Sequence, residues 1–114
     1  MKYITIPSSI DLYNVQGDRI HDERGTPQYM TFEHFIYGRL VDPAFGCDMA
    51  AVCSVVEVKT QMKGANGVLA LENVDWERLA EATRHGKYHP LVAHCLLPFM
   101  KAITEASSEK PKEH

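Results

Sequence analysis

The chain has 114 residues, of which 45% are hydrophobic and 24% are charged, and its formal net charge is -3. A chain of this length predicts one domain with a real core, and the composition excludes wholesale disorder. Several basic residues lie beside acidic ones, as in Glu77-Arg78, so no basic stripe forms and nucleic-acid binding is excluded as the main function.

The cysteines favour a reducing compartment. There are three of them, and Cys47, Cys53 and Cys95 form no CxxC pair. No stretch approaches the roughly 20 apolar residues needed to span a membrane, and the N-terminal residues lack the apolar run of a signal peptide. We therefore expect a cytoplasmic protein that does not associate with membranes.

The N-terminal third predicts a small β-hairpin or meander. Residues 3–6 are β-branched or aromatic throughout, and Pro7 ends this strand. A second strand (10–15), a turn (16–18) and a return strand (19–21) are expected to follow. An exposed loop (22–27) then leads to two residues that rejoin the sheet (29–30). An isolated hairpin is marginal in water, so this element must pack on the helices or on a partner.

Two helices are expected in the middle of the chain. Thr31 is a suitable N-cap for the first, which Asp42-Pro43 ends. Asp48 is a suitable N-cap for the second, over residues 49–62, whose apolar stripe is Met49, Val52, Cys53 and Val56. Alternation over 56–62 also fits a strand, but the length of the segment favours a helix.

The next stretch predicts a strand or buried linker and then a third helix. Residues 68–72 are short and apolar. Asp75 is the expected N-cap of the helix that follows, with Val74 packing on Leu79 as a staple. Gly86 is expected to end this helix in a left-handed conformation.

A long apolar helix is expected to run from Pro90 to Ala106, bent at Pro98. Residues 107–114 are polar and are expected to form a disordered tail. The sequence shows no internal repeat. These elements predict an α+β fold, with the N-terminal hairpin or meander packed on about four helices in a single domain of residues 1–106.

Residues for metal or thiol chemistry are present, but their spacing is poor. The candidate metal ligands, within eleven residues, are His85, His89, His94 and Cys95. Zinc needs three or four such ligands in a tetrahedron, and a glycine separates the first two histidines. Cys47 precedes a helix start, which favours a thiolate. We predict no enzyme and no cofactor, with a metal- or thiol-dependent enzyme or sensor as the alternative.

Aromatic side chains are the other functional candidates. They are numerous for one small core, and any that stay exposed beside the last helix would form a partner-binding patch. The residues predicted for this patch are Phe45, Trp76, Tyr88 and Phe99. The competing interpretation is that these rings fill the core.

Four stretches set the layout of the chain: ITIPSSIDLYNVQGDRI, TFEHFIYGRLVDP, LALENVDWERLAEATRH and YHPLVAHCLLPFMKAI. In this layout the chain resembles small proteins of tailed-phage and prophage structural modules, of the tail assembly chaperone or minor morphogenesis kind. The resemblance covers most of the chain, rests on no diagnostic motif and carries over no site residue. It implies protein binding without catalysis, in the host cytoplasm or the virion, with virion components or a second copy as partners. An inhibitor of a host enzyme is a third hypothesis.

Overall fold

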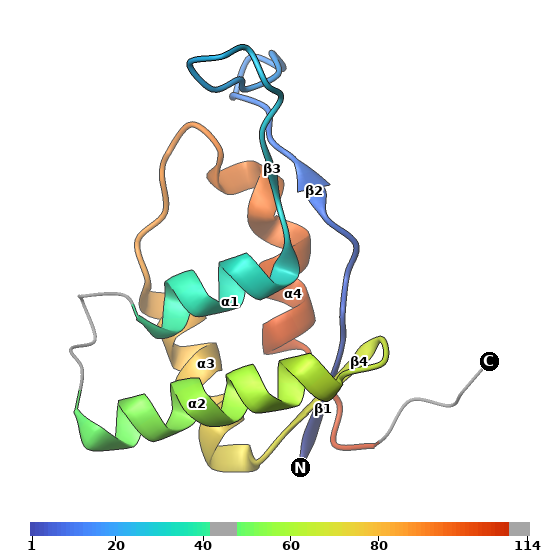
Figure 1. Cartoon of the computed structure of the whole chain (residues 1–114), viewed down its shortest axis with the longest axis vertical. Helices are drawn as coiled ribbons and strands as arrows, with labels where there is room; N and C mark the ends of the chain where they lie inside the picture. Colours follow the sequence, from blue (N-terminus) through green and yellow to red (C-terminus); the bar gives the residue numbers. More distant parts are fainter. Residues whose placement is uncertain (42–47, 110–114) are drawn as a thin grey trace.

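The computed structural model describes residues 1–41 and 48–109 and confirms an α+β fold (Figure 1). Within these described residues, four α-helices carry the core, and two small antiparallel sheets of two strands each flank it. In chain order the elements are β1 (Lys2–Thr5), β2 (Ile10–Asp11), β3 (Tyr29–Met30), α1 (Phe32–Leu40), α2 (Met49–Gly64), β4 (Val68–Leu71), α3 (Asn73–His85), the 3₁₀ helix η2 (Ala93–Leu96) and α4 (Leu97–Thr104).

The first sheet joins the N-terminus to the middle of the chain. β1 pairs antiparallel with β4, so residues 68–71 form a strand rather than a linker. Ser107 forms two backbone hydrogen bonds with Tyr3, of 2.8 and 3.1 Å. Ser107 is therefore paired with the sheet, although the sequence places the start of a disordered tail there. Residues 110–114 of that predicted tail lie outside the described residues.

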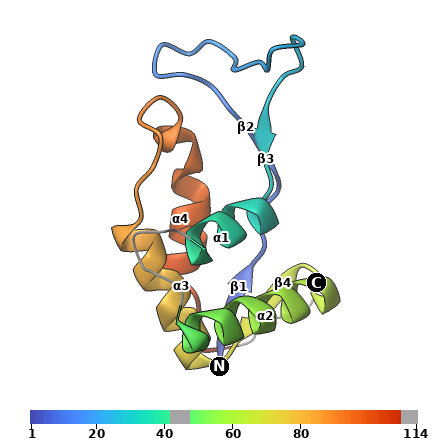
Figure 2. The ribbon, with the colours of Figure 1, turned by 60° about the vertical axis from the view of Figure 1, so that its left-hand side comes forward.

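The second sheet carries an arm that extends away from the helices (Figure 2). Three residues spaced eight positions apart, Leu12, Ile20 and Gln28, are joined by backbone hydrogen bonds. The amide of each residue donates to the carbonyl of another, so that the three form a closed ring. Between them lie two turns of the same design, in which Asn14 or Asp22 accepts hydrogen bonds from backbone amides two and four residues later. This two-unit repeat is absent from the sequence prediction, and the predicted return strand is reduced to isolated bridges.

Glycine closes each of these two turns. Gly17 and Gly25 have φ of 92° and 82°, a left-handed conformation that costs glycine little and other residues more. The pattern Asn or Asp, two residues, then Gly is therefore the sequence signal of the repeat, at 14–17 and at 22–25.

The predicted N-caps of α1 and α2 are confirmed. The Thr31 hydroxyl accepts from the His34 amide at 3.2 Å, and the Asp48 carboxylate accepts from the Ala51 amide at 2.8 Å. Residues 49–64 are helical, so the length of the segment is a better guide than its local alternation. The predicted end of α1 at Asp42-Pro43 lies outside the described residues.

We expect Thr31→Ala to lower the free energy of unfolding by about 1 kcal/mol, because the His34 amide loses its acceptor. Urea denaturation followed by far-UV circular dichroism measures this change. Thr31→Ser keeps the hydroxyl and should stay within about 0.5 kcal/mol of the wild type. Equal losses in both variants would contradict a capping role.

The predicted caps of α3 are wrong. The helix begins at Asn73, and the residue at its N-cap position, Glu72, makes no side-chain capping bond. Asp75 instead lies within the first turn and is buried against α2, while Val74 is 61% exposed and does not act as a staple. Gly86 has a φ of -67°, which is not left-handed.

The predicted long helix after Pro90 is also wrong. Residues 90–92 form a turn, η2 follows, and α4 spans only Leu97–Thr104. Pro98 lies in the first turn of α4, where its missing amide leaves no helical hydrogen bond unmade. The proline therefore begins a new helix instead of bending an existing one.

The core lies where α1, α3, α4 and the first sheet meet. Phe99 is fully buried at its centre, and its ring contacts those of Phe32 and Phe35 at centroid distances of 5.3 and 5.5 Å. The other fully buried large side chains are Ile4, Ile36, Val58, Leu69, Leu71, Leu79 and Ile103. Each of the described α-helices and the first sheet contribute to this cluster.

Candidate functional site

Of the four predicted aromatic residues, the three that the structure describes do not form an exposed patch. Phe99 is fully buried, so the expectation that it offers surface is wrong. Trp76 is partly buried, and its indole N–H donates to the Ile103 carbonyl at 2.9 Å. The Tyr88 hydroxyl donates to the Thr83 carbonyl at 2.7 Å. Both side chains therefore have structural roles. Phe45 lies outside the described residues.

The side chains proposed as alternative metal ligands contact different partners and do not meet at one site. His85 contacts Glu81 at 3.0 Å, the His89 Nδ1 accepts from the Leu91 amide at 3.3 Å, and only the neighbours His94 and Cys95 touch, at 3.4 Å. Within residues 1–41 and 48–109, no three His, Cys, Asp or Glu side chains are placed to share a metal ion.

In the described part of the chain, few groups lie close enough to a cysteine to take part in thiol chemistry. Cys95 is partly buried, and its Sγ lies 3.2 Å from the Tyr13 carbonyl and 3.3 Å from the Tyr13 amide. Cys53 is exposed, although its apolar neighbours in the sequence are typical of a buried cysteine. Cys47 lies outside the described residues.

One tyrosine has a clearly shifted acidity. The pKa of Tyr37 is raised above its usual value by burial and by its hydrogen bond to Glu33, whose carboxylate accepts from the hydroxyl at 3.1 Å. A tyrosine hydroxyl is protonated at neutral pH even with its ordinary pKa, and the raised pKa of Tyr37 extends this protonated state to higher pH. Tyr37 is therefore a hydrogen-bond donor on the surface of α1 and is unsuited to act as a base.

The candidate interaction surface is a set of exposed hydrophobic side chains on α2. Its stripe of Met49, Val52, Cys53 and Val56, which we call the apolar face of α2, is exposed to solvent: Met49 is 82% and Val56 is 58% exposed. The sequence identifies this stripe, and the structure shows that it faces solvent. The side of α2 that is buried carries Ser54 and Val58 instead.

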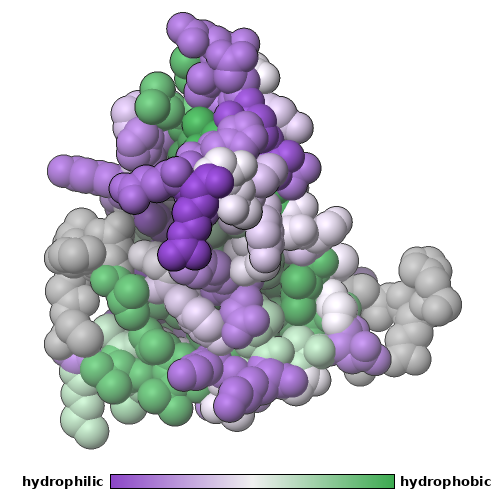
Figure 3. Space-filling model, turned by 45° about the horizontal axis from the view of Figure 1, so that its top comes forward, coloured by the Kyte–Doolittle hydropathy of each residue, from purple (hydrophilic) through white to green (hydrophobic). Residues whose placement is uncertain are grey.

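A helix on the surface of a globular protein normally presents polar side chains to water and apolar ones to the core. In α2 both sides are apolar over the N-terminal half. Figure 3 shows hydrophobic side chains gathered over this part of the molecule, at its lower left. Exposed apolar patches of this kind mark sites of interaction with other molecules.

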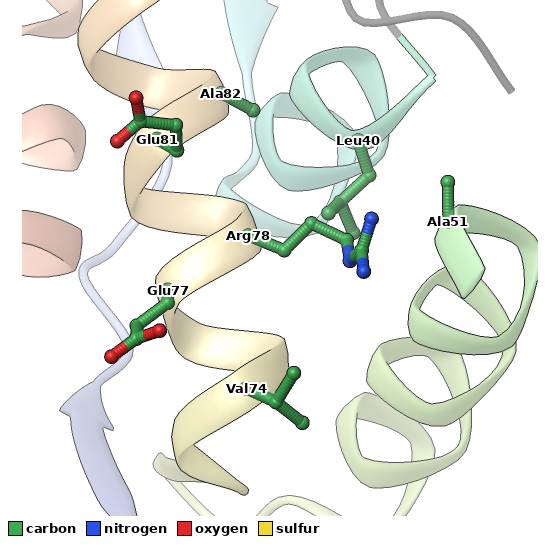
Figure 4. A pocket seen from close by; sticks show the side chains of 7 residues that line it. All are labelled: Leu40, Ala51, Val74, Glu77, Arg78, Glu81 and Ala82. Atoms are coloured by element: carbon green, nitrogen blue, oxygen red, sulfur yellow. The ribbon is translucent and has the colours of Figure 1, made fainter. Parts of the chain in front are cut away.

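A groove opens beside this helix, between α1, α2 and α3, with a volume of about 440 Å³ (Figure 4). Its apolar lining is Leu40, Ala51, Val74 and Ala82, and its charged lining is Glu77, Arg78 and Glu81. The Arg78 side chain extends toward the gap between Leu40 and Ala51. The groove is thus mostly apolar with one cation directed into it.

The Arg78 guanidinium has few hydrogen-bond and ion-pair partners among the described residues. Its nearest carboxylate is that of Asp48, at 4.0 Å, and its Nε is buried with no hydrogen-bond partner in the described part of the chain. An unmade hydrogen bond at a buried donor costs about 1–3 kcal/mol. In the sequence Arg78 looks like a surface charge balanced by Glu77, and nothing in the pattern indicates that it enters a groove.

Comparisons with protein-family models, with curated proteins and with solved structures found no match for this chain. None of the described helices combines the length and the apolar character needed to cross a bilayer. The fold and its surfaces are therefore the basis for functional inference.

Proposed function

We propose that this chain is a non-enzymatic interaction factor that binds another protein through the apolar face of α2. The observation that carries this proposal is the exposure of Met49, Val52, Cys53 and Val56 on a helix whose opposite side buries Ser54 and Val58. Water contact at these side chains is unfavourable by about 25 cal/mol per Å² of apolar area. A protein partner that covers them recovers this free energy.

The spacing of these four residues supports a helical mode of recognition. They stand at positions i, i+3, i+4 and i+7, which are the anchor positions of a helix that lies in an apolar groove. Polar residues border the face at its C-terminal end, where Lys59 and Lys63 are exposed. An apolar centre with a polar rim is the usual anatomy of a protein interface.

The setting we propose is the assembly of a phage tail or virion, or a similar multiprotein process. Its support is the layout resemblance to small tail assembly chaperones, together with the exposed face. Proteins encoded beside this chain are then the first partners to test, followed by a second copy of the chain.

We expect Val56→Asp to abolish or weaken partner binding by at least about tenfold, because a charge would be buried at the interface. The stability of the free protein should change by less than about 1 kcal/mol, since Val56 is already 58% exposed. Co-purification with proteins encoded by neighbouring genes, followed by calorimetric titration, measures the effect.

Ala50→Asp is the matched control. It adds the same charge to the first turn of the same helix, at an exposed position outside the apolar face. This variant should bind as the wild type does. Unchanged binding by Val56→Asp, or equal losses in both variants, would contradict the proposal.

A further inference from the structure

We propose that the groove between α1, α2 and α3 receives an apolar segment of the partner protein, and that Arg78 binds a carboxylate on this segment. That the occupant is a protein segment rests on the function proposed above. The choice of a carboxylate rests on the groove itself, and its evidence is separate from the apolar face of α2.

The first argument is the state of the Arg78 guanidinium. It carries five donors in a planar fork that matches a carboxylate. Within the described part of the chain none of them donates a hydrogen bond, and the nearest acidic oxygen is Asp48 Oδ1 at 4.0 Å. That same oxygen accepts from the Ala51 amide at 2.8 Å. Asp48 is therefore a helix cap that forms only a long ion pair with Arg78, too long for a hydrogen bond to the guanidinium.

The second argument is the sign of the charge inside the groove. Figure 4 shows Glu77 and Glu81 on the other side of α3 from the Arg78 guanidinium. Glu81 also contacts His85 at 3.0 Å. Arg78 is therefore the charged group directed between α1 and α2, and the complementary group on an occupant is an anion.

The third argument is the apolar lining. Leu40, Val74 and Ala82 line the groove into which Arg78 extends, and Val74 is 61% exposed. A volume of about 440 Å³ lies within the usual range for ligand sites, about 300–1,000 Å³. An apolar lining with one directed polar group selects a ligand that has both characters. An Asp or Glu flanked by apolar side chains meets this requirement.

The test uses two small probes that differ only in charge. The probes are 4-phenylbutyrate, which presents an apolar group and a carboxylate, and its neutral amide, 4-phenylbutanamide. Each is titrated into the ¹⁵N-labelled full chain, and the backbone amides and the Arg78 Nε–H are followed by NMR. A ligand of this size is expected to bind in the millimolar range.

We expect the carboxylate to bind about tenfold more tightly than the amide and to shift the Arg78 Nε–H together with the amides of Val74 and Ala82. Arg78→Gln should remove this preference. Arg84→Gln, which removes the same charge from an exposed position of the same helix, should retain it. The comparison of the two probes on the wild type does not depend on how any variant folds.

Three results would overturn the proposal: equal binding of the two probes, an unchanged preference in Arg78→Gln, or no shift at the groove residues. Failure here is distinguishable from failure of the proposed function. Val56→Asp should weaken partner binding while leaving the carboxylate preference intact, whereas Arg78→Gln should remove that preference while the apolar face of α2 is unchanged.

Discussion

Phe99→Ala is expected to lower the free energy of unfolding by about 3–5 kcal/mol. The ring is fully buried and contacts Phe32 edge-on and Phe35 at a tilt, so its removal leaves a cavity between α1 and α4. Urea denaturation, followed by tryptophan fluorescence and far-UV circular dichroism, measures the loss. A change of this size would unfold a substantial fraction of a marginally stable domain.

The control for this variant lies two residues earlier in the same helix. Leu97 is exposed, so Leu97→Ala should cost less than about 1 kcal/mol. Similar losses in the two variants would show that α4 does not face the core as described.

Asp75→Ala is expected to destabilise the protein by about 2–3 kcal/mol, the second largest effect. Its carboxyl group accepts from the Ser54 hydroxyl at 2.8 Å, and both residues are buried between α2 and α3. Removing Asp75 leaves the hydroxyl without its acceptor in a site that is largely shielded from water. Thermal and urea denaturation measure the loss.

A double-mutant cycle separates this hydrogen bond from the packing around it. Ser54→Ala removes the donor, and the variant with both changes leaves neither polar group without its partner. The double variant should therefore cost less than the sum of the two single variants. Strictly additive losses would show that Ser54 and Asp75 do not interact.

The sequence predicts the helices well where local signals are strong. The Thr31 and Asp48 caps and the length of α2 agree with the structure, because a cap depends only on the next few residues. The strand at 68–71 depends on a distant partner. Its pairing with the N-terminus is not encoded locally, so the sequence leaves a strand and a linker equally open.

The C-terminal helices show where local signals mislead. Asp75 looks like a cap, but its burial against Ser54 is a tertiary contact between segments 21 residues apart. Pro98 looks like a kink in one long helix because the apolar residues on both sides keep a helical spacing. A new helix that begins near the proline avoids the kink, and no pattern in the sequence distinguishes these outcomes.

The candidate site could be predicted only in part. Helix α2 carries one apolar stripe through Met49 and Val56 and a second through Val55, Val58 and Met62. Periodicity identifies both stripes, but only the structure shows that the second packs on the core and the first faces water. The entry of Arg78 into the groove depends on how three helices meet, which a single sequence does not show.

The central claim, that a partner protein covers the apolar face of α2, is tested most directly through Cys53. This exposed thiol lies within the face, and alkylation reports on whether it is covered. The measurement is the rate of maleimide labelling at Cys53, determined by peptide mass spectrometry for the purified chain and for the chain in its native lysate. For the wild type we predict labelling several-fold slower in the lysate than in the purified chain, and for Val56→Asp we predict equal rates in the two preparations. Equal rates for the purified chain and the chain in the lysate would contradict the account.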